Sequence, residues 1–279
     1  MATKSAIDSL INLTGRVAVI TGGAGLLGPK HAEALAECGA SIVLLDRLPK
    51  VRSVAAAIGK NHKVKAIGLV CDITKKKDLE KSLAAILKKF GRVDILINNA
   101  ANNPAVGAGG LSQNWSRIEN FPLKAWERDL AVGLTGSFLA SQVFGSEMAR
   151  QNSGVILNIA SDLGLVAPDQ RLYRKPGLAP HQQPAKPVTY SVVKHGMIGL
   201  TKYLASFWAD QGVRVNAISP GGVYTDQPAD FVKKLSKHVP LHRMANVNEY
   251  KAAVVFLVSD ASAYMTGANL VVDGGRTVW

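Results

Sequence analysis

The chain has 279 residues, of which 47% are hydrophobic and 19% charged, and this composition excludes a globally disordered or fibrous protein. No apolar run reaches the roughly 18–20 residues that cross a bilayer, and the polar N-terminus lacks a signal peptide's apolar segment, so we expect a cytoplasmic protein without membrane contact. The formal net charge is +13, but no basic–aromatic pattern accompanies it, which favours a solvated surface over nucleic-acid binding. Two distant cysteines and scattered histidines predict neither a disulfide framework nor a metal site.

Seven short apolar runs alternate with amphipathic stretches along the whole chain. The runs are mostly continuous and rich in Val, Ile and Leu, as is typical of strands buried on both faces, and they span residues 16–21, 41–46, 64–70, 93–98, 154–160, 213–219 and 269–272. Helical patterns cover residues 28–38, 78–90, 123–150, 190–211 and 247–259. This order predicts a single α/β domain over residues 1–279, a doubly wound Rossmann fold whose seven-stranded parallel sheet has helices on both faces.

The first predicted strand runs into a turn containing Gly22, Gly25 and Gly28, and then into a helix. Glycines in this context let the backbone approach a pyrophosphate at the helix N-terminus, so the turn predicts a dinucleotide site rather than a merely structural turn. Asp46 ends the second strand, where a carboxylate can accept hydrogen bonds from the adenosine ribose and would repel a 2′-phosphate. This favours NAD over NADP, while the following Arg47 keeps NADP possible.

Tyr190 and Lys194 lie four residues apart, which places them on one face of a helix. A free phenol titrates near pKa ~10, and a neighbouring ammonium lowers that pKa toward neutrality. The pair therefore predicts an acid/base centre, with an ordinary surface pair as the alternative.

Together with Asn98-Asn99-Ala100, Ser161, Pro220-Gly221 and Asp273-Gly274-Gly275, these motifs resemble in order and context the short-chain dehydrogenase/reductase family over residues 13–275. The resemblance implies reversible hydride transfer between a nicotinamide cofactor and a secondary alcohol or ketone. In it, Tyr190 transfers the proton, Lys194 lowers its pKa and contacts the nicotinamide ribose, and Ser161 orients the substrate oxygen. It also implies a homotetramer or dimer built from the two long helices. Implied cofactor contacts, besides Tyr190 and Lys194, are Gly22, Gly25, Leu26, Leu27, Gly28, Asp46, Arg47, Asp72, Ile73, Asn99, Ala100, Ala101, Val132, Pro220, Gly221, Val223 and Thr225.

The sequence departs from the family pattern in two places that matter for function. Gly133 stands where the family usually has an asparagine that holds a water of the proton relay. Ser161 and Tyr190 are 29 residues apart, about twice the family's usual spacing, which predicts an active-site insert at about residues 162–189. Arg171 and Arg174 in this insert could clamp a carboxylate or phosphate, so we expect a sugar-like or anionic polyhydroxylated substrate. The alternative is a solvated or oligomer-contact loop.

Two other functions stay open at this point. One is an NADPH-dependent reductase of ketones or oxoacyl thioesters, using Arg47. The other is a non-catalytic dinucleotide-binding sensor or scaffold, which Gly133 permits and the Ser161, Tyr190 and Lys194 trio disfavours. The insert and the flanking motifs look like those of family members that act in bacterial polysaccharide or flagellin-glycan biosynthesis.

Overall fold

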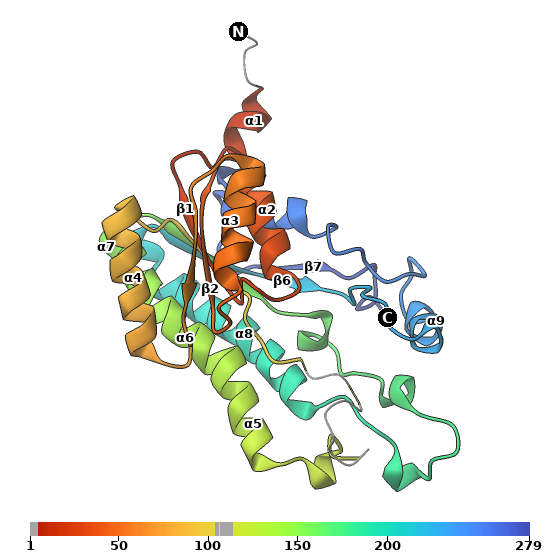
Figure 1. Ribbon diagram of the computed structural model, residues 1–279. Helices are drawn as coiled ribbons and strands as arrows, with labels where there is room; N and C mark the ends of the chain where they lie inside the picture. Colours follow the sequence, from red (N-terminus) through yellow and green to blue (C-terminus); the bar gives the residue numbers. More distant parts are fainter. Residues whose placement is uncertain (1–4, 104–105, 107–113) are drawn as a thin grey trace.

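The computed structural model describes residues 5–103, 106 and 114–279, and a parallel seven-stranded sheet forms its centre (Figure 1). The spatial order is β3-β2-β1-β4-β5-β6-β7, and every neighbouring pair is parallel. The strands are β1 (Val17–Thr21), β2 (Ser41–Asp46), β3 (Ala66–Val70), β4 (Ile95–Asn98), β5 (Gly154–Ile159), β6 (Val213–Pro220) and β7 (Asn269–Val272). The predicted fold is confirmed, and the predicted strand ends differ from these by no more than two residues.

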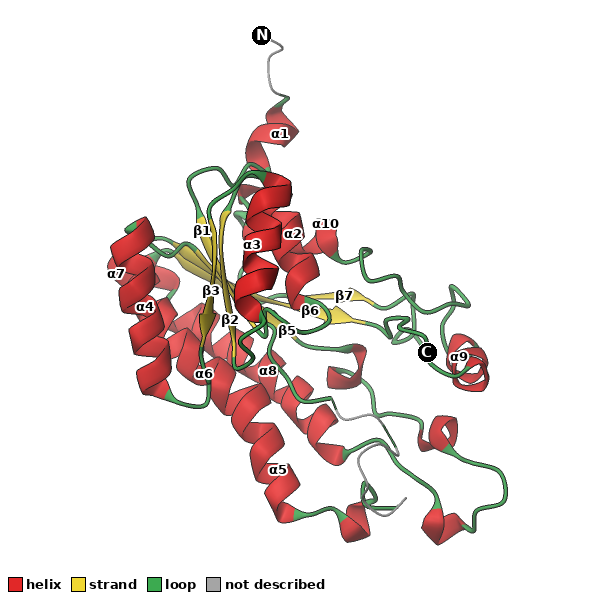
Figure 2. Ribbon diagram, in the orientation of Figure 1, coloured by secondary structure: helices red, strands yellow, loops and turns green. Residues whose placement is uncertain are grey.

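Helices cover both faces of the sheet (Figure 2). One layer holds α2 (Gly28–Glu37), α3 (Val51–His62) and α10 (Lys251–Val258), while α4 (Lys76–Phe90), a long central helix and α8 (Val188–Phe207) form the other. Alternate strand residues supply the two cores: Ala18 and Ile20 of β1 belong to one, Val17 and Val19 to the other. The remaining helices are the short α1 (Ala6–Leu10) and α9 (Ala229–Ser236). No described helix is both long enough and apolar enough to span a bilayer.

The long central helix contains two π turns. It runs through α5 (Leu123–Leu130), the π turn Ala131–Thr135, α6 (Gly136–Ala140), the π turn Ser141–Gly145 and α7 (Ser146–Arg150). Every fourth residue along it is buried, and these residues are Ala125, Asp129, Gly133, Ser137, Ser141 and Gly145. Two of them anchor other elements: Asp129 accepts hydrogen bonds from the side chains of Thr189 and Asn102, and Ser141 accepts one from Asn98.

Two long loops follow β4 and β5 at the carboxyl edge of the sheet, where doubly wound folds bind ligands. The insert after β5 has no long helix and contains the short 3-10 turns Asp162–Gly164, Gln170–Tyr173 and Pro180–Gln182. It packs on α9 through Tyr173 and Phe231, whose ring centres are 5.7 Å apart. Residues 104–105 and 107–113 of the other loop lie outside the described residues.

Candidate active site

A cavity of about 1190 Å³ opens at the carboxyl ends of the central strands. Because single-ligand pockets have volumes of roughly 300–1,000 Å³, this one has room for a dinucleotide and a substrate together. Of the expected cofactor contacts, the structure places these on the cavity wall: Gly22, Gly25, Leu26, Leu27, Asp46, Arg47, Asp72, Ile73, Asn99, Ala100, Ala101, Val132, Tyr190, Lys194, Pro220, Gly221, Val223 and Thr225. Gly28 alone among them lies outside the wall, and it serves packing: a Cβ there would collide with the carbonyl oxygen of Gly22.

The glycine turn fits a pyrophosphate. Gly22 has φ +65°, and a Cβ on it would lie 2.9 Å from the Cα of Ala100, so only glycine keeps this close approach. Asn99 supports the turn by donating its side-chain amide to the carbonyl of Thr21 at 3.0 Å. The N-terminus of α2, which favours negative charge, begins at the end of this turn.

The adenosine end of the cavity carries the side chains expected to discriminate between cofactors. The Asp46 carboxylate accepts the backbone N–H of Ala24 and of Leu48, each at 3.0 Å, which fixes it beside the glycine turn. Arg47 is exposed on the same rim. On the next loop, a hydrogen bond from Thr74 holds the pKa of Asp72 below its usual value and keeps that carboxylate charged.

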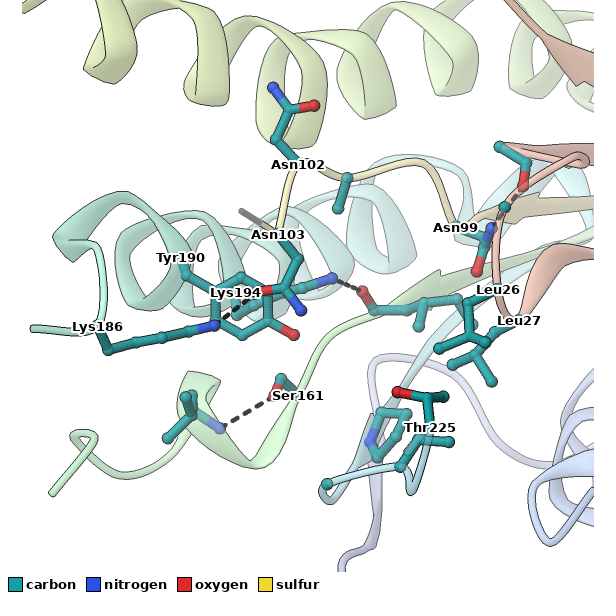
Figure 3. Close-up of a pocket in the computed structure, with 18 of the residues that line it drawn as sticks. Leu26, Leu27, Asn99, Asn102, Asn103, Ser161, Lys186, Tyr190, Lys194 and Thr225 are labelled. Atoms are coloured by element: carbon teal, nitrogen blue, oxygen red, sulfur yellow. Dashed lines mark hydrogen bonds between the residues drawn. The ribbon is translucent and has the colours of Figure 1, made fainter. Parts of the chain in front are cut away.

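Ser161, Tyr190 and Lys194 meet in the same cavity although they come from two elements (Figure 3). Ser161 follows β5, and α8 carries both Tyr190 and Lys194. The Lys194 ammonium is buried, which lowers its pKa to about 8, and it donates a 2.7 Å hydrogen bond to the carbonyl of Ile159. Burial raises the pKa of Tyr190, while the neighbouring Ser161 hydroxyl lowers it in part.

The expected lowering of the Tyr190 pKa by Lys194 is therefore not the dominant effect in this structure. The Lys194 ammonium lies 5.7 Å from the centre of the Tyr190 ring and bonds to the backbone instead of the phenol. Desolvation of the phenolate is the largest effect on the Tyr190 pKa.

Two functional candidates, Asp162 and Arg276, were missed by sequence reasoning. The Ser161 hydroxyl donates to Asp162 at 2.7 Å, and the other Asp162 oxygen lies 3.1 Å from the Arg276 guanidinium. Both charged side chains are nearly buried, at 5% and 11% exposure. Because Arg276 follows β7, far along the chain, no sequence spacing could have indicated this pair.

Val193 occupies the space that a side chain at Gly133 would need. A Cβ at Gly133 would lie 2.5 Å from a methyl carbon of Val193 on α8. The absence of the family's asparagine is thus matched by local packing.

Behind the site, buried hydrogen bonds join Asn98, Asn158 and Thr201, which ties β4 and β5 to α8.

The insert places its two arginines differently. Arg171 is exposed and outside the cavity wall, paired with Asp169 at 2.9 Å, which departs from the expectation that it contacts substrate. This local pair forms because Arg171 lies two residues after Asp169, which caps the start of the 3-10 turn Gln170–Tyr173. Arg174 lines the cavity mouth, as does Lys175. Lys186, which sequence reasoning missed, lies 4.4 Å from the centre of the Tyr190 ring, and its sequence signal is its place four residues before Tyr190 at the start of α8.

The doubly wound sheet carries a glycine turn, and the cavity beside it gathers a serine, a tyrosine and a lysine. Together these features define a nicotinamide-dependent oxidoreductase acting on CH–OH groups. The chain belongs to the short chain dehydrogenase family, whose model matches residues 16–173. A second model, described as enoyl-(acyl carrier protein) reductase, matches residues 178–277.

Relatives and solved structures cover nearly the whole chain. It is similar to the NAD-dependent glycerol dehydrogenase of Listeria innocua, with 35% identity and 99% of each chain covered. It is equally similar to the D-threitol dehydrogenase of Mycolicibacterium smegmatis, with 35% identity over 99% of this chain and 98% of the relative. The crystal structure of a gluconate 5-dehydrogenase from Burkholderia cenocepacia, in complex with NADP and tartrate, matches with a TM-score of 0.84 at 28% identity, covering 98% of this chain and 99% of that one.

Proposed function

We propose that this protein oxidises a secondary alcohol of a polyhydroxylated, sugar-like substrate, or reduces the matching ketone, with NAD preferred over NADP. The observation that carries the proposal is the meeting of Ser161, Tyr190 and Lys194 in a cavity large enough for cofactor and substrate. The names of the relatives, which are dehydrogenases of glycerol and D-threitol, support a polyol substrate. The carboxylate of Asp46 beside the glycine turn supports NAD, and Arg47 is the feature that would serve NADP.

The chemistry divides between the cofactor and the chain. When bound, the nicotinamide supplies or accepts the hydride. Tyr190 exchanges the proton with the substrate oxygen, and the buried Lys194 charge stabilises the phenolate as it forms. The Ser161 proton points to Asp162 and one lone pair of its oxygen accepts the backbone N–H of Leu163, which leaves the second lone pair to accept the substrate hydroxyl and orient it.

A small screen tests this proposal. Purified protein is mixed with NAD or NADP and with glycerol, D-threitol or D-glucitol, and the absorbance of the reduced cofactor is followed. We expect turnover that is faster with NAD and that falls at least about a thousandfold in Tyr190→Phe, because the phenol proton is lost. NADH binding, measured by its fluorescence, is expected to persist in that variant.

The outcomes separate the alternatives. Simple ketones and oxoacyl thioesters are added in a second panel with NADPH, and turnover of these compounds alone would favour the NADPH-dependent reductase. Tight NADH binding without turnover of any of these compounds would favour a dinucleotide sensor, for which the replacement of the relay asparagine by Gly133 is the supporting feature.

We also propose that the protein assembles as a dimer or tetramer through the long central helix and α8. Phe138, Tyr203 and Phe207 are exposed on these helices, and the last two rings stack with centres 5.9 Å apart. Light scattering tests this, and Phe207→Asp is expected to dissociate the assembly.

We propose that the protein works in the cytoplasm, because the unpaired thiols of Cys38 and Cys71 suit a reducing compartment. We propose bacterial glycan biosynthesis as the setting of the carbohydrate activity.

A further inference from the structure

The charged side chains around the substrate end of the cavity fall into two groups. In the first, each charge has an opposite partner, and the pairs are Arg276–Asp162 at 3.1 Å, Arg128–Asp129 at 3.5 Å and Lys234–Asp230 at 2.6 Å. The second group, apart from Lys194 of the serine, tyrosine and lysine trio, consists of Arg174, Lys175 and Lys186, which line the same wall. Within the described part of the chain, none of these three cations has a carboxylate at salt-bridge distance. The wall therefore carries a surplus of positive charge.

Lys186 is the least exposed of the three and the nearest to the reacting groups. Its ammonium lies 4.4 Å from the centre of the Tyr190 ring and donates a 2.6 Å hydrogen bond to the side-chain oxygen of Asn103 (Figure 3). Burial lowers the pKa of Lys186 to about 8, which shows that its charge is held at a cost. A neutral amide satisfies one of the three ammonium protons, and the Asp162 carboxylate, which lies beyond salt-bridge distance, offsets only part of the cost of burial.

A substrate anion would supply the missing charge. An ammonium that is partly removed from water, with protons still free, binds an oxyanion more strongly than an exposed lysine does. The position of Lys186 beside Tyr190 places such an anion close to the carbon that bears the reacting oxygen. Arg174 and Lys175, which are exposed at the mouth, add attraction for the same charge.

We propose that Lys186 binds an anionic oxygen group of the substrate, a carboxylate or a phosphate, with Arg174 and Lys175 supporting it at the cavity mouth. This inference rests on the proposed function, because it assigns the substrate class of that same site. Arg171 has no part in the subsite, since Asp169 already holds its guanidinium outside the cavity.

Binding to the NADH-loaded protein tests the subsite without requiring turnover. Two matched pairs of probes are titrated while the NADH fluorescence or the heat of binding is followed: D-gluconate against D-glucitol, and glycerol 3-phosphate against glycerol. The variants are Lys186→Met, which removes the charge, and Lys186→Arg, which keeps it. Lys88→Met, on the exposed face of α4, makes the same change of net charge away from the cavity.

We expect the wild-type protein to bind at least one anion at least about tenfold more tightly than its neutral counterpart, as befits one charge-assisted hydrogen bond. Lys186→Met should reduce that preference about tenfold or more, Lys186→Arg should retain most of it, and Lys88→Met should not change it. The pair of probes that shows the preference distinguishes carboxylate from phosphate. Retained NADH binding in Lys186→Met confirms that the variant is folded.

Two results overturn the inference: no preference for either anion in the wild-type protein, or a preference that survives in Lys186→Met. Failure of the proposed function has a different signature. Tyr190-dependent turnover of neutral polyols without any anion preference leaves the dehydrogenase standing and removes the subsite. Anion binding that depends on Lys186, with no alcohol oxidised, leaves the subsite standing and removes the reaction.

Discussion

Restoring the family's asparagine at Gly133 should destabilise this protein, and the size of the effect follows from one contact. A Cβ at Gly133 would lie 2.5 Å from the Val193 methyl, whereas ordinary contacts are 3.4–4 Å, so α8 or the central helix must move by about 1 Å. Overpacking of this kind costs about 1–3 kcal/mol. A buried amide without a partner adds about 1–3 kcal/mol, and the helix propensity gained by replacing glycine returns at most about 1 kcal/mol. We therefore expect Gly133→Asn to lower the free energy of unfolding by about 3 kcal/mol.

Thermal unfolding at fixed protein and cofactor concentration measures this loss, which corresponds to a Tm lowered by about 6–12 °C. Gly133→Ala, which adds the Cβ without the amide, should lose less. Because Val193 precedes Lys194 on α8, the kcat of Gly133→Asn should also fall.

The contact itself is tested by repeating the substitution in a Val193→Ala background, where the methyl carbons that clash are absent. There, Gly133→Asn should cost at least about 1 kcal/mol less than in the wild-type protein. An equal loss of Tm in both backgrounds, or no loss in either, would refute the reasoning.

Two further predictions concern buried charges. Arg276→Met leaves the Asp162 carboxylate buried without its partner, so the variant should lose about 3 kcal/mol of unfolding free energy. Its pH profile of activity should shift to higher pH, because the unbalanced charge raises the pKa of Tyr190. Adding Asp162→Asn to this variant should reverse the shift, and an unchanged profile would contradict this account. Burial lowers the pKa of His31 from 6.5 to about 4, so the folded protein holds this imidazole neutral. Its contribution to the free energy of unfolding is fully present above pH 6.5, and up to roughly 3 kcal/mol is lost as the pH falls toward 4. His31→Leu should flatten stability between these pH values in chemical unfolding, whereas the exposed-site control His181→Gln should keep the wild-type slope.

The fold could be predicted from the sequence because its signals are local. Continuous apolar runs marked all seven strands, and the glycine turn after the first strand marked the end of the sheet at which the cavity opens. The helix α3 was not predicted, because only Val51, Ala55 and Ile58 of its residues are buried and the rest of its pattern is weak. The π turns were not predicted either, since they depend on how the central helix packs against its neighbours.

The rest of the site was less accessible from the sequence. Lys186 lies four residues before Tyr190, so that spacing was present in the sequence, but nothing there showed that its ammonium would lie against the ring. Arg276 reaches Asp162 from beyond the last strand, a contact that no sequence spacing indicates. Arg171 is the opposite case: its partner Asp169 is two positions away, so the pair that keeps it from the cavity was present in the sequence.

The four-residue spacing of buried positions on the central helix has a geometric consequence. An α-helix turns by about 100° per residue, so each step of four residues overshoots a full turn by about 40°. Over the five steps from Ala125 to Gly145, the buried stripe would drift by about 200° and face the opposite side. The two π turns wind less per residue and remove this drift. Asp129, which anchors Thr189 and Asn102, and Ser141, which anchors Asn98, therefore point the same way, so one side of a single helix supports both the substrate loops and the interior of the sheet.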